Sequence, residues 1–316
     1  LANGAPVETY DNADVQGLAK VFTGWDLDGP ETDVQFHRRP MALNPALHSL
    51  AEKRFLGAVI PPGTDGHLSL KRAMEVISAH PNVGPFIGTQ LIQRLVTSNP
   101  SPAYVGRVAA VFDDDGHGAR GNLKAVVRAI LLDDEARHPD LAAPGWGKVR
   151  EPILRFSGWA RAFGATSTNG AWAMPDTTDN TIRLAQSPMR SASVFNFFRP
   201  RYTPPVTELA RRGLVAPELQ ITDETSIAGY LNFVAIYVDR GWEDLQTPYT
   251  AEIALAADAD ALVARVVLLL AGDAFSAATA QAIARAVDTL PRERPLDRVR
   301  AAITLVAASP EYLVQK

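Results

Sequence analysis

The sequence predicts an all-α fold, an irregular multi-helical domain with long loops rich in proline and glycine. Apolar residues recur at intervals of three and four along most of the chain, which is the period of an amphipathic helix. Several of these stripes begin at a capping signal, such as Ser101 followed by Pro102. Only residues 54–60 resemble a strand, and they lie among turn residues, so we expect at most a minor β-hairpin.

A series of apolar stripes defines the predicted helices in chain order. Asp11 or Asn12 caps the first stripe, Ser69 precedes the second, and Asn122 caps the fifth. By their first and last inward residues, the stripes span 15–22, 70–77, 83–95, 105–112, 123–130, 153–163, 227–234, 262–269, 280–287 and 299–306.

Two stretches, 26–66 and 166–221, break the helical pattern. Long irregular segments in compact domains are either functional or disordered. The second stretch carries too many aromatic residues for disorder, so we expect it to pack against the helices. We therefore predict an N-proximal helical half at 1–165, a structured connecting loop at 166–221 and a C-terminal helical half at 222–316. One continuous domain is the alternative.

The composition excludes several classes of function. The chain has 316 residues, of which 47% are hydrophobic and 21% charged, enough to form a sizeable core. A net charge of −4 argues against a general nucleic-acid binder, because such binding needs excess lysine and arginine. The chain has no cysteine, which excludes thiol nucleophiles and thiolate metal sites. The longest apolar run, 266–272, is far shorter than the roughly 20 residues of a membrane span, so we expect no transmembrane segment.

The common catalytic and metal-binding signatures are absent. The chain has no nucleophile elbow, paired zinc histidines, phosphate loop or dinucleotide fingerprint. Residues 113–118 read DDDGHG, like a calcium loop, but His117 and Lys124 occupy two ligand positions, so we predict an acidic turn. No two histidines are three or four residues apart, and we predict no metal site and no cofactor. The histidines are His37, His48, His67, His80, His117 and His138.

Several longer segments are distinctive when taken together. They are 14–25 (DVQGLAKVFTGW), 53–57 (KRFLG), 80–96 (HPNVGPFIGTQLIQRLV), 121–137 (GNLKAVVRAILLDDEAR), 193–205 (SVFNFFRPRYTPP) and 309–316 (SPEYLVQK). With them the chain resembles the C-terminal portion of the uncharacterised bacterial "domain of unknown function 1800" family. The resemblance implies an exported protein, periplasmic or extracellular. It also implies a sulfatase-like partner of the "domain of unknown function 1501" family, and it supplies no catalytic motif.

The start of the chain gives a further expectation. The first residue is Leu1 rather than methionine, and the resembling family usually carries an additional N-terminal helical region. We expect that upstream region, or a companion chain, to cover an apolar surface formed by Val15, Phe22 and Trp25.

One candidate binding site lies on the predicted helix at 83–95. Gln90 and Arg94 are one turn apart at the edge of its apolar stripe. A guanidinium beside an apolar face suits a carboxylate or phosphate ligand. It suits an internal ion pair equally well, with Glu75 or Glu151 as the partner.

The segment 193–205 supplies further candidates, Asn196, Arg199 and Tyr202, which alternate with three phenylalanines. Such a mixture of apolar anchors and directional donors is typical of a ligand groove or partner surface. We expect at least two phenylalanines to be buried, the segment to fold over the helix with Gln90 and Arg94, and Arg199 or Tyr202 to form a groove rim. A loop that is merely fastened to the core is the alternative.

Two functions from different classes remain open. The first is a non-catalytic binding or scaffold protein for a protein partner or an extracellular polymer. The alternative is an enzyme of an undescribed type, a hydrolase with a histidine or carboxylate base. Its candidate catalytic residues are His48, His80, Glu151 and Glu218, and convergence of two of them in a concave pocket would favour it.

Overall fold

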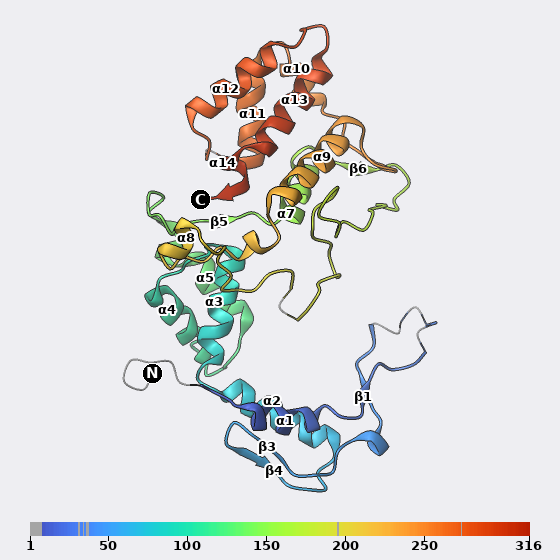
Figure 1. Ribbon diagram of the computed structural model, residues 1–316, viewed down its shortest axis with the longest axis vertical. Coiled ribbons are helices and arrows are strands. Elements are labelled where there is room, and N and C mark those ends of the chain that lie inside the picture. The colour runs from blue at the N-terminus through green and yellow to red at the C-terminus, as the bar shows by residue number, and fades with distance from the viewer. Residues whose placement is uncertain (1–7, 31, 34, 36–37, 195, 273) are drawn as a thin grey trace. The chain divides into compact units, whose positions relative to one another are not determined.

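The computed structural model describes residues 8–30, 32–33, 35, 38–194, 196–272 and 274–316. Helices dominate these residues, and the strands form only antiparallel pairs of two or three residues (Figure 1). The predicted mainly helical fold is therefore confirmed. The expected hairpin is also present, because Lys53–Phe55 (β3) pairs with Ala58–Ile60 (β4).

The helices follow in this order: α1 (Asn12–Val21), α2 (Gly66–Ala79), α3 (Val83–Leu95), α4 (Pro102–Asp113), α5 (Leu123–Leu132), α6 (Asp134–Arg137), α7 (Pro152–Ala162), α8 (Glu208–Arg211), α9 (Glu224–Arg240), α10 (Thr250–Leu255), α11 (Ala259–Ala271), α12 (Ala277–Asp288), α13 (Pro295–Ala308) and α14 (Pro310–Leu313). Two 3-10 helices are η2 (Pro45–Leu47) and η3 (Pro217–Gln220). The remaining strand pairs are β1 (Trp25–Asp26) with β2 (Ala42–Leu43), β5 (Lys148–Val149) with β8 (Val314–Gln315), and β6 (Thr166–Ser167) with β7 (Leu245–Gln246).

The chain divides into two compact units. Unit 1 contains residues 1–87 and 109–123, and unit 2 contains residues 88–108 and 124–316. These boundaries differ from the predicted halves and connecting loop, a division that stays a prediction. The described residues include no helix with the length and apolar character that a membrane crossing requires.

Unit 1 is built around α1, α2 and the β3–β4 hairpin. Its core contains Val21, Phe55, Ile60 and Ala73. The backbone of Gly17 lies so close to the hairpin that a Cβ atom would be 1.7 Å from the carbonyl oxygen of Arg54, so only glycine fits there. This close approach fixes α1 against β3.

The helix starts in unit 1 test the predicted caps. The Asp11 carboxylate accepts the backbone N–H groups of Ala13 and Asp14, which confirms the first predicted cap. The second helix begins earlier than expected. Its cap is Asp65, whereas Ser69 lies buried inside the first turns of α2. Of the helix residues before Ser69 only Leu68 is a large apolar residue, and it is exposed, so the inward apolar stripe did not mark the first turn.

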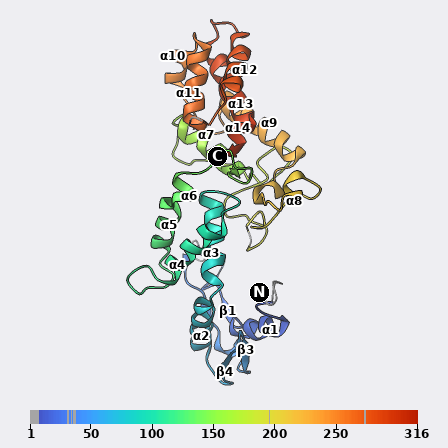
Figure 2. The same ribbon diagram turned by 90° about the vertical axis from the view of Figure 1, so that its left-hand side faces the viewer.

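Unit 2 has the larger apolar core. Helices α11, α12 and α13 lie side by side in both views (Figures 1 and 2), and α9 packs on α13. An aromatic cluster joins α7 to α9, with the rings of Phe156 and Tyr237 4.8 Å apart at their centroids. The Trp159 indole donates a hydrogen bond of 3.1 Å to the Tyr249 hydroxyl.

The long stretch 166–221 packs against the helices of unit 2, as predicted. Leu184 is buried in the apolar core, and the Thr177 hydroxyl donates to the backbone carbonyl of Gln186 at 2.6 Å. On α9, a Cβ atom at Gly229 would lie 2.8 Å from the carbonyl oxygen of Asn180. These contacts fix the stretch locally, although most of it is neither helix nor strand.

Candidate functional site

The segment predicted to cover α3 does pack on it. Phe198 is buried, and the guanidinium of Arg94 lies 4.1 Å from the centre of its ring. Phe197 is half-buried, and Phe195 and His37 lie outside the described residues. Of the two phenylalanines of this segment that the structure describes, Phe198 is fully buried and Phe197 only partly, so the expectation of at least two buried rings stays a prediction.

The guanidinium of Arg94 forms the internal ion pair that was one of its two predicted roles. One of its nitrogens lies 3.0 Å from a carboxylate oxygen of Glu151, whose other oxygen accepts a 2.6 Å hydrogen bond from Gln186. The other predicted partner, Glu75, instead pairs with Arg72. The charge of Arg94 is thus already neutralised within the protein.

A second, more deeply buried pair lies beside the first. Lys148 and Glu218 are 4% and 1% exposed, with 3.6 Å between the ammonium and the nearer carboxylate oxygen. The ammonium also donates a 2.6 Å hydrogen bond to the backbone carbonyl of Arg94. Burial lowers the pKa of Lys148 and raises the pKa of Glu218, while the attraction of the two charges opposes both shifts. Two cations and two carboxylates therefore form one neutral cluster, the Arg94–Glu218 cluster.

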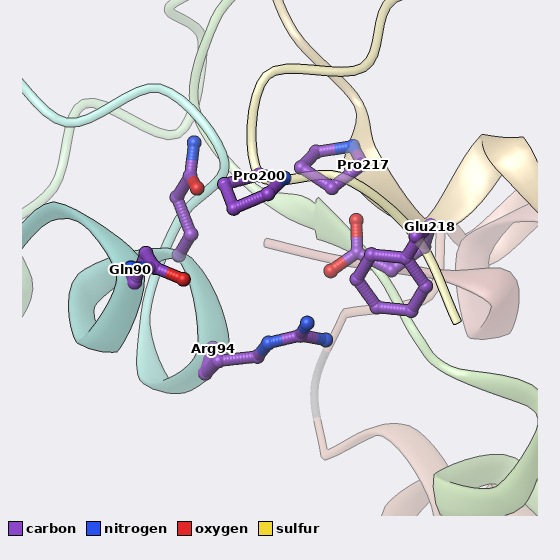
Figure 3. A pocket seen from close by; sticks show the side chains of 7 residues that line it. Gln90, Arg94, Pro200, Pro217 and Glu218 are labelled. Atoms are coloured by element: carbon purple, nitrogen blue, oxygen red, sulfur yellow. The ribbon is translucent and has the colours of Figure 1, made fainter. Parts of the chain in front are cut away.

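A small pocket adjoins this cluster, and Figure 3 shows Gln90 and Arg94 facing Glu218 across it. Its volume of about 10 Å³ has room for about one water molecule. Within the described residues, one oxygen of Glu218 faces no hydrogen-bond partner. The pocket is lined by Gln90, Gln93, Arg94, Phe198, Pro200, Pro217 and Glu218.

The other predicted binding residues, Asn196, Arg199 and Tyr202, do not line this pocket. Arg199 is exposed, and its backbone N–H donates to the side chain of Gln220 at 2.8 Å. Tyr202 is half-buried and does not line the pocket, and its backbone carbonyl accepts a hydrogen bond from the N–H of Ala216. Asn196 adopts a left-handed backbone conformation in a tight turn and does not line the pocket either. Phe198 and Pro200 line the pocket instead, and the Arg199 side chain between them is exposed.

The candidate catalytic residues divide between the two units. His48 and His80 belong to unit 1, whereas Glu151 and Glu218 belong to unit 2. The Nδ1 atom of His48 donates to the carbonyl oxygen of Thr23 at 2.9 Å. The Nδ1 atom of His80 accepts the backbone N–H of Asn82 at 3.1 Å, in the turn after α2. Both histidines therefore bond to the backbone of unit 1. The two glutamates are the catalytic candidates that lie together, in the Arg94–Glu218 cluster.

The acidic turn at 113–118 has the predicted structural character. The carboxylates of Asp114 and Asp115 accept backbone N–H groups of their own loop, including those of Gly116 and His117. Within the described part of the chain, no three histidine or acidic side chains gather in a way that could hold a metal ion.

A larger cavity in unit 2 was not predicted. It is a groove of about 530 Å³, inside the range of about 300–1,000 Å³ that is usual for ligand sites. We call it the α7 groove, because α7 forms one wall. It is lined by Ile153, Phe156, Ser157, Ala160, Arg161, Trp172, Met174, Pro175, Asp176, Thr177, Ser187, Pro188, Arg190 and Leu245.

The apolar surface of the α7 groove is continuous with the core of unit 2. Phe156 and Leu245 are core residues that also line the groove. Ala160 adds a small side chain one turn further along α7, which leaves space above the helix. Trp172 and Met174 line it from the loop and remain substantially exposed, at 54% and 40%.

The loop that carries Trp172 is fixed by one buried carboxylate. Asp244 accepts the backbone N–H groups of Trp172 and Ala173 at 2.9 and 2.8 Å, and it also accepts the hydroxyl of Ser167. These hydrogen bonds hold the pKa of Asp244 below its ordinary value. Trp172 has a backbone φ of 52°, a left-handed conformation that is costly for a bulky residue. The carboxylate thus holds an exposed indole in a conformation it would not adopt freely.

The sequence carried only a weak sign of this groove. Its α7 residues belong to the same apolar stripe that builds the core, so periodicity cannot separate the two roles. Trp172 and Met174, two large apolar residues in a stretch without helical periodicity, were the available signal.

The fold and the α7 groove define a helical protein with a ligand-sized surface cavity. The chain belongs to the family described as "Protein of unknown function (DUF1800)", whose profile matches residues 2–314, essentially the whole chain. The resemblance seen in the sequence is therefore confirmed. No curated protein matches the chain, and no solved structure does.

Proposed function

We propose that the protein is a non-catalytic binding protein that holds a segment of a protein partner in the α7 groove. The observation that carries this proposal is the groove itself, which combines ligand-site volume with core residues at its surface. The hydrogen bonds that the Asp244 carboxylate accepts support it, because they fix one wall before any partner binds.

The lining favours a protein segment over a polysaccharide. Most of the surface is apolar, and it includes Phe156, Trp172 and Met174. Aromatic and methionine side chains are enriched where proteins bind one another. An extracellular polymer is the outcome that would replace this proposal.

The family resemblance extends the proposal in two respects. It suggests export to the periplasm or the extracellular space. It also suggests the sulfatase-like protein of the "domain of unknown function 1501" family as the partner. The function proposed here requires no cofactor.

Photo-crosslinking in the source organism tests this proposal. We place the photoreactive residue p-benzoylphenylalanine in place of Pro188, an exposed residue of the groove lining. We expect a discrete covalent adduct, and mass spectrometry of the adduct then shows whether it contains a protein or a polymer.

Two matched controls make the result specific. The same photoreactive residue in place of the exposed Gln281 on α12 should give no such adduct. Ala160→Trp, which fills the groove, should abolish the adduct formed at position 188 while the far-UV circular dichroism stays unchanged. Equal adducts at both positions, or none at position 188, would contradict the proposal.

A hydrolase is the second candidate, and one observation favours it. Glu218 is a buried carboxylate with a raised pKa, and beside the water-sized pocket one of its oxygens has no partner among the described residues. Such a group suits a general base or acid that acts on water. The pocket has no room for a substrate, which is why binding in the α7 groove is preferred.

Activity measurements on the purified protein decide this alternative. A hydrolase should cleave members of a p-nitrophenyl ester and glycoside panel, and Glu218→Gln should lower kcat by about 100-fold or more. Ala160→Trp should leave that activity unchanged. Wild-type protein without turnover on the panel, or turnover that survives Glu218→Gln, would sink the hydrolase proposal.

A further inference from the structure

The α7 groove carries one uncompensated positive charge. Three charged side chains line it, and two of these, Arg190 and Asp176, form an ion pair at 2.9 Å. The third, Arg161, is exposed in the last turn of α7. Within the described residues, no carboxylate pairs with its guanidinium and no acceptor binds it. The groove is therefore apolar with a single free cation at its wall.

The groove also contains a hydroxyl that has no hydrogen-bond partner among the described residues. Ser187 lines the groove and is 6% exposed. No other part of the chain that the structure describes supplies a hydrogen-bond partner for this hydroxyl. An occupant that displaces water from this hydroxyl without bonding to it leaves the hydroxyl unpaired, which costs free energy. An occupant that supplies a donor or acceptor beside Ser187 is therefore favoured.

These two observations define the chemistry of the occupant. The guanidinium calls for an anion, most directly a carboxylate. The apolar walls favour apolar side chains, and the Ser187 hydroxyl favours a polar group on the same ligand. A plain acyl chain would leave the Ser187 hydroxyl unpaired, whereas a peptide main chain offers carbonyl and N–H groups at regular intervals.

We infer that the α7 groove recognises the carboxyl-terminal end of a partner chain. In this arrangement the last apolar side chains lie against Phe156 and Trp172, the main chain bonds to Ser187, and the terminal carboxylate pairs with Arg161. A terminal carboxylate supplies the anion without placing an acidic side chain among apolar ones. This inference rests on the proposed function and names the element of the partner that is bound.

Peptide binding to the full chain tests the inference. The probes are fluorescein-labelled tetrapeptides with Ala, Val, Leu, Phe or Trp as the last residue, each made as the free acid and as the terminal amide. We expect the best free acid to bind wild-type protein about 10- to 100-fold more tightly than its amide, the range of one charge-assisted contact. Fluorescence polarisation gives both Kd values.

Two variants locate the contacts. In Arg161→Gln the acid and the amide should bind equally, because the charge that separates them is gone. In Ser187→Ala both should weaken by the same factor, about fivefold. Arg285→Gln, an exposed arginine on α12, should leave both Kd values unchanged.

Failure of the inference and failure of the proposed function look different. If acids and amides bind wild-type protein alike, carboxyl-terminal recognition is wrong while a peptide groove remains. If none of the peptides binds, the inference is also wrong, and the adduct at position 188 decides the proposed function separately. A preference for the acid that persists in Arg161→Gln would place the anion site elsewhere and overturn the assignment.

Discussion

Lys148→Met is expected to lower the free energy of unfolding of unit 2 by about 3–5 kcal/mol at pH 7, the usual cost of breaking a buried ion pair. The ammonium is the nearest cation to Glu218, and both side chains are almost fully buried. Its removal leaves the carboxylate without charge compensation at that distance, and it also leaves the Arg94 carbonyl without its donor. The apolar replacement is similar in length, so packing changes little.

The cost of Lys148→Met should depend on pH in a defined direction. Burial already raises the pKa of Glu218 above its ordinary value of 4.5 in the folded state, and loss of Lys148 should raise it further. The folded variant then binds a proton more readily than the unfolded chain, so its stability rises as the pH falls from 7 toward 4.5. We therefore expect a smaller cost at pH 5 than at pH 7.

Urea unfolding followed by tryptophan fluorescence measures these differences, because four of the five tryptophans belong to unit 2. The matched control is the double variant Lys148→Met with Glu218→Leu, which removes both charges together. It should recover most of the lost stability, since apolar residues often replace a buried pair without loss. A double variant as unstable as Lys148→Met, or a cost independent of pH, would contradict this account.

The second large effect is expected for a buried arginine of unit 2, Arg298 on α13. Arg298 is 1% exposed and donates to three acceptors: the carbonyls of Ala256 and Leu290 at 2.6 and 2.8 Å, and the Asp288 carboxylate at 2.7 Å. These acceptors lie at the C-terminal ends of α10 and α12 and just beyond α12. One side chain on α13 thus satisfies groups that the helices leave open.

Arg298→Met should therefore cost about 3–5 kcal/mol, because three hydrogen bonds from a charged donor are lost and the carbonyls of Ala256 and Leu290 lose that donor. The same substitution at the exposed Arg285 of α12 should change stability by less than about 0.5 kcal/mol. Urea unfolding of both variants gives the comparison. If the two variants cost the same, the buried contacts of Arg298 contribute nothing specific.

Helices could be predicted from the sequence where a capping residue marks the first turn. Asp11 and Ser101 each cap a predicted helix, and both accept backbone N–H groups of the first turn. Short helices such as α10 could not be predicted. Its cap position is Tyr249, a buried aromatic residue in a left-handed conformation that carries no local start signal. Packing against the core determines where α10 begins, and a short window of sequence does not show which residues pack together.

Only the part of the candidate site that lies on one face of a single helix could be predicted from the sequence. Gln90 and Arg94 share a pocket because they lie one turn apart on α3. The choice of Glu151 over Glu75 depends on the fold, since no spacing links Arg94 to a residue so far along the chain. The α7 groove was missed for the same reason. Its wall exists only because Asp244 binds the backbone at 172 and 173 across a long sequence separation.

The pairing of β5 with β8 has a consequence for the synthesis of the chain. Lys148 and Val149 pair with Gln315 and Val314, and the N–H of Arg150 donates to the carbonyl of Leu313. During translation, β5 emerges from the ribosome long before its partner exists. The β5–β8 pair therefore cannot form until residues 313–315 have emerged, and the unpaired β5 edge is open to non-native contacts throughout that interval.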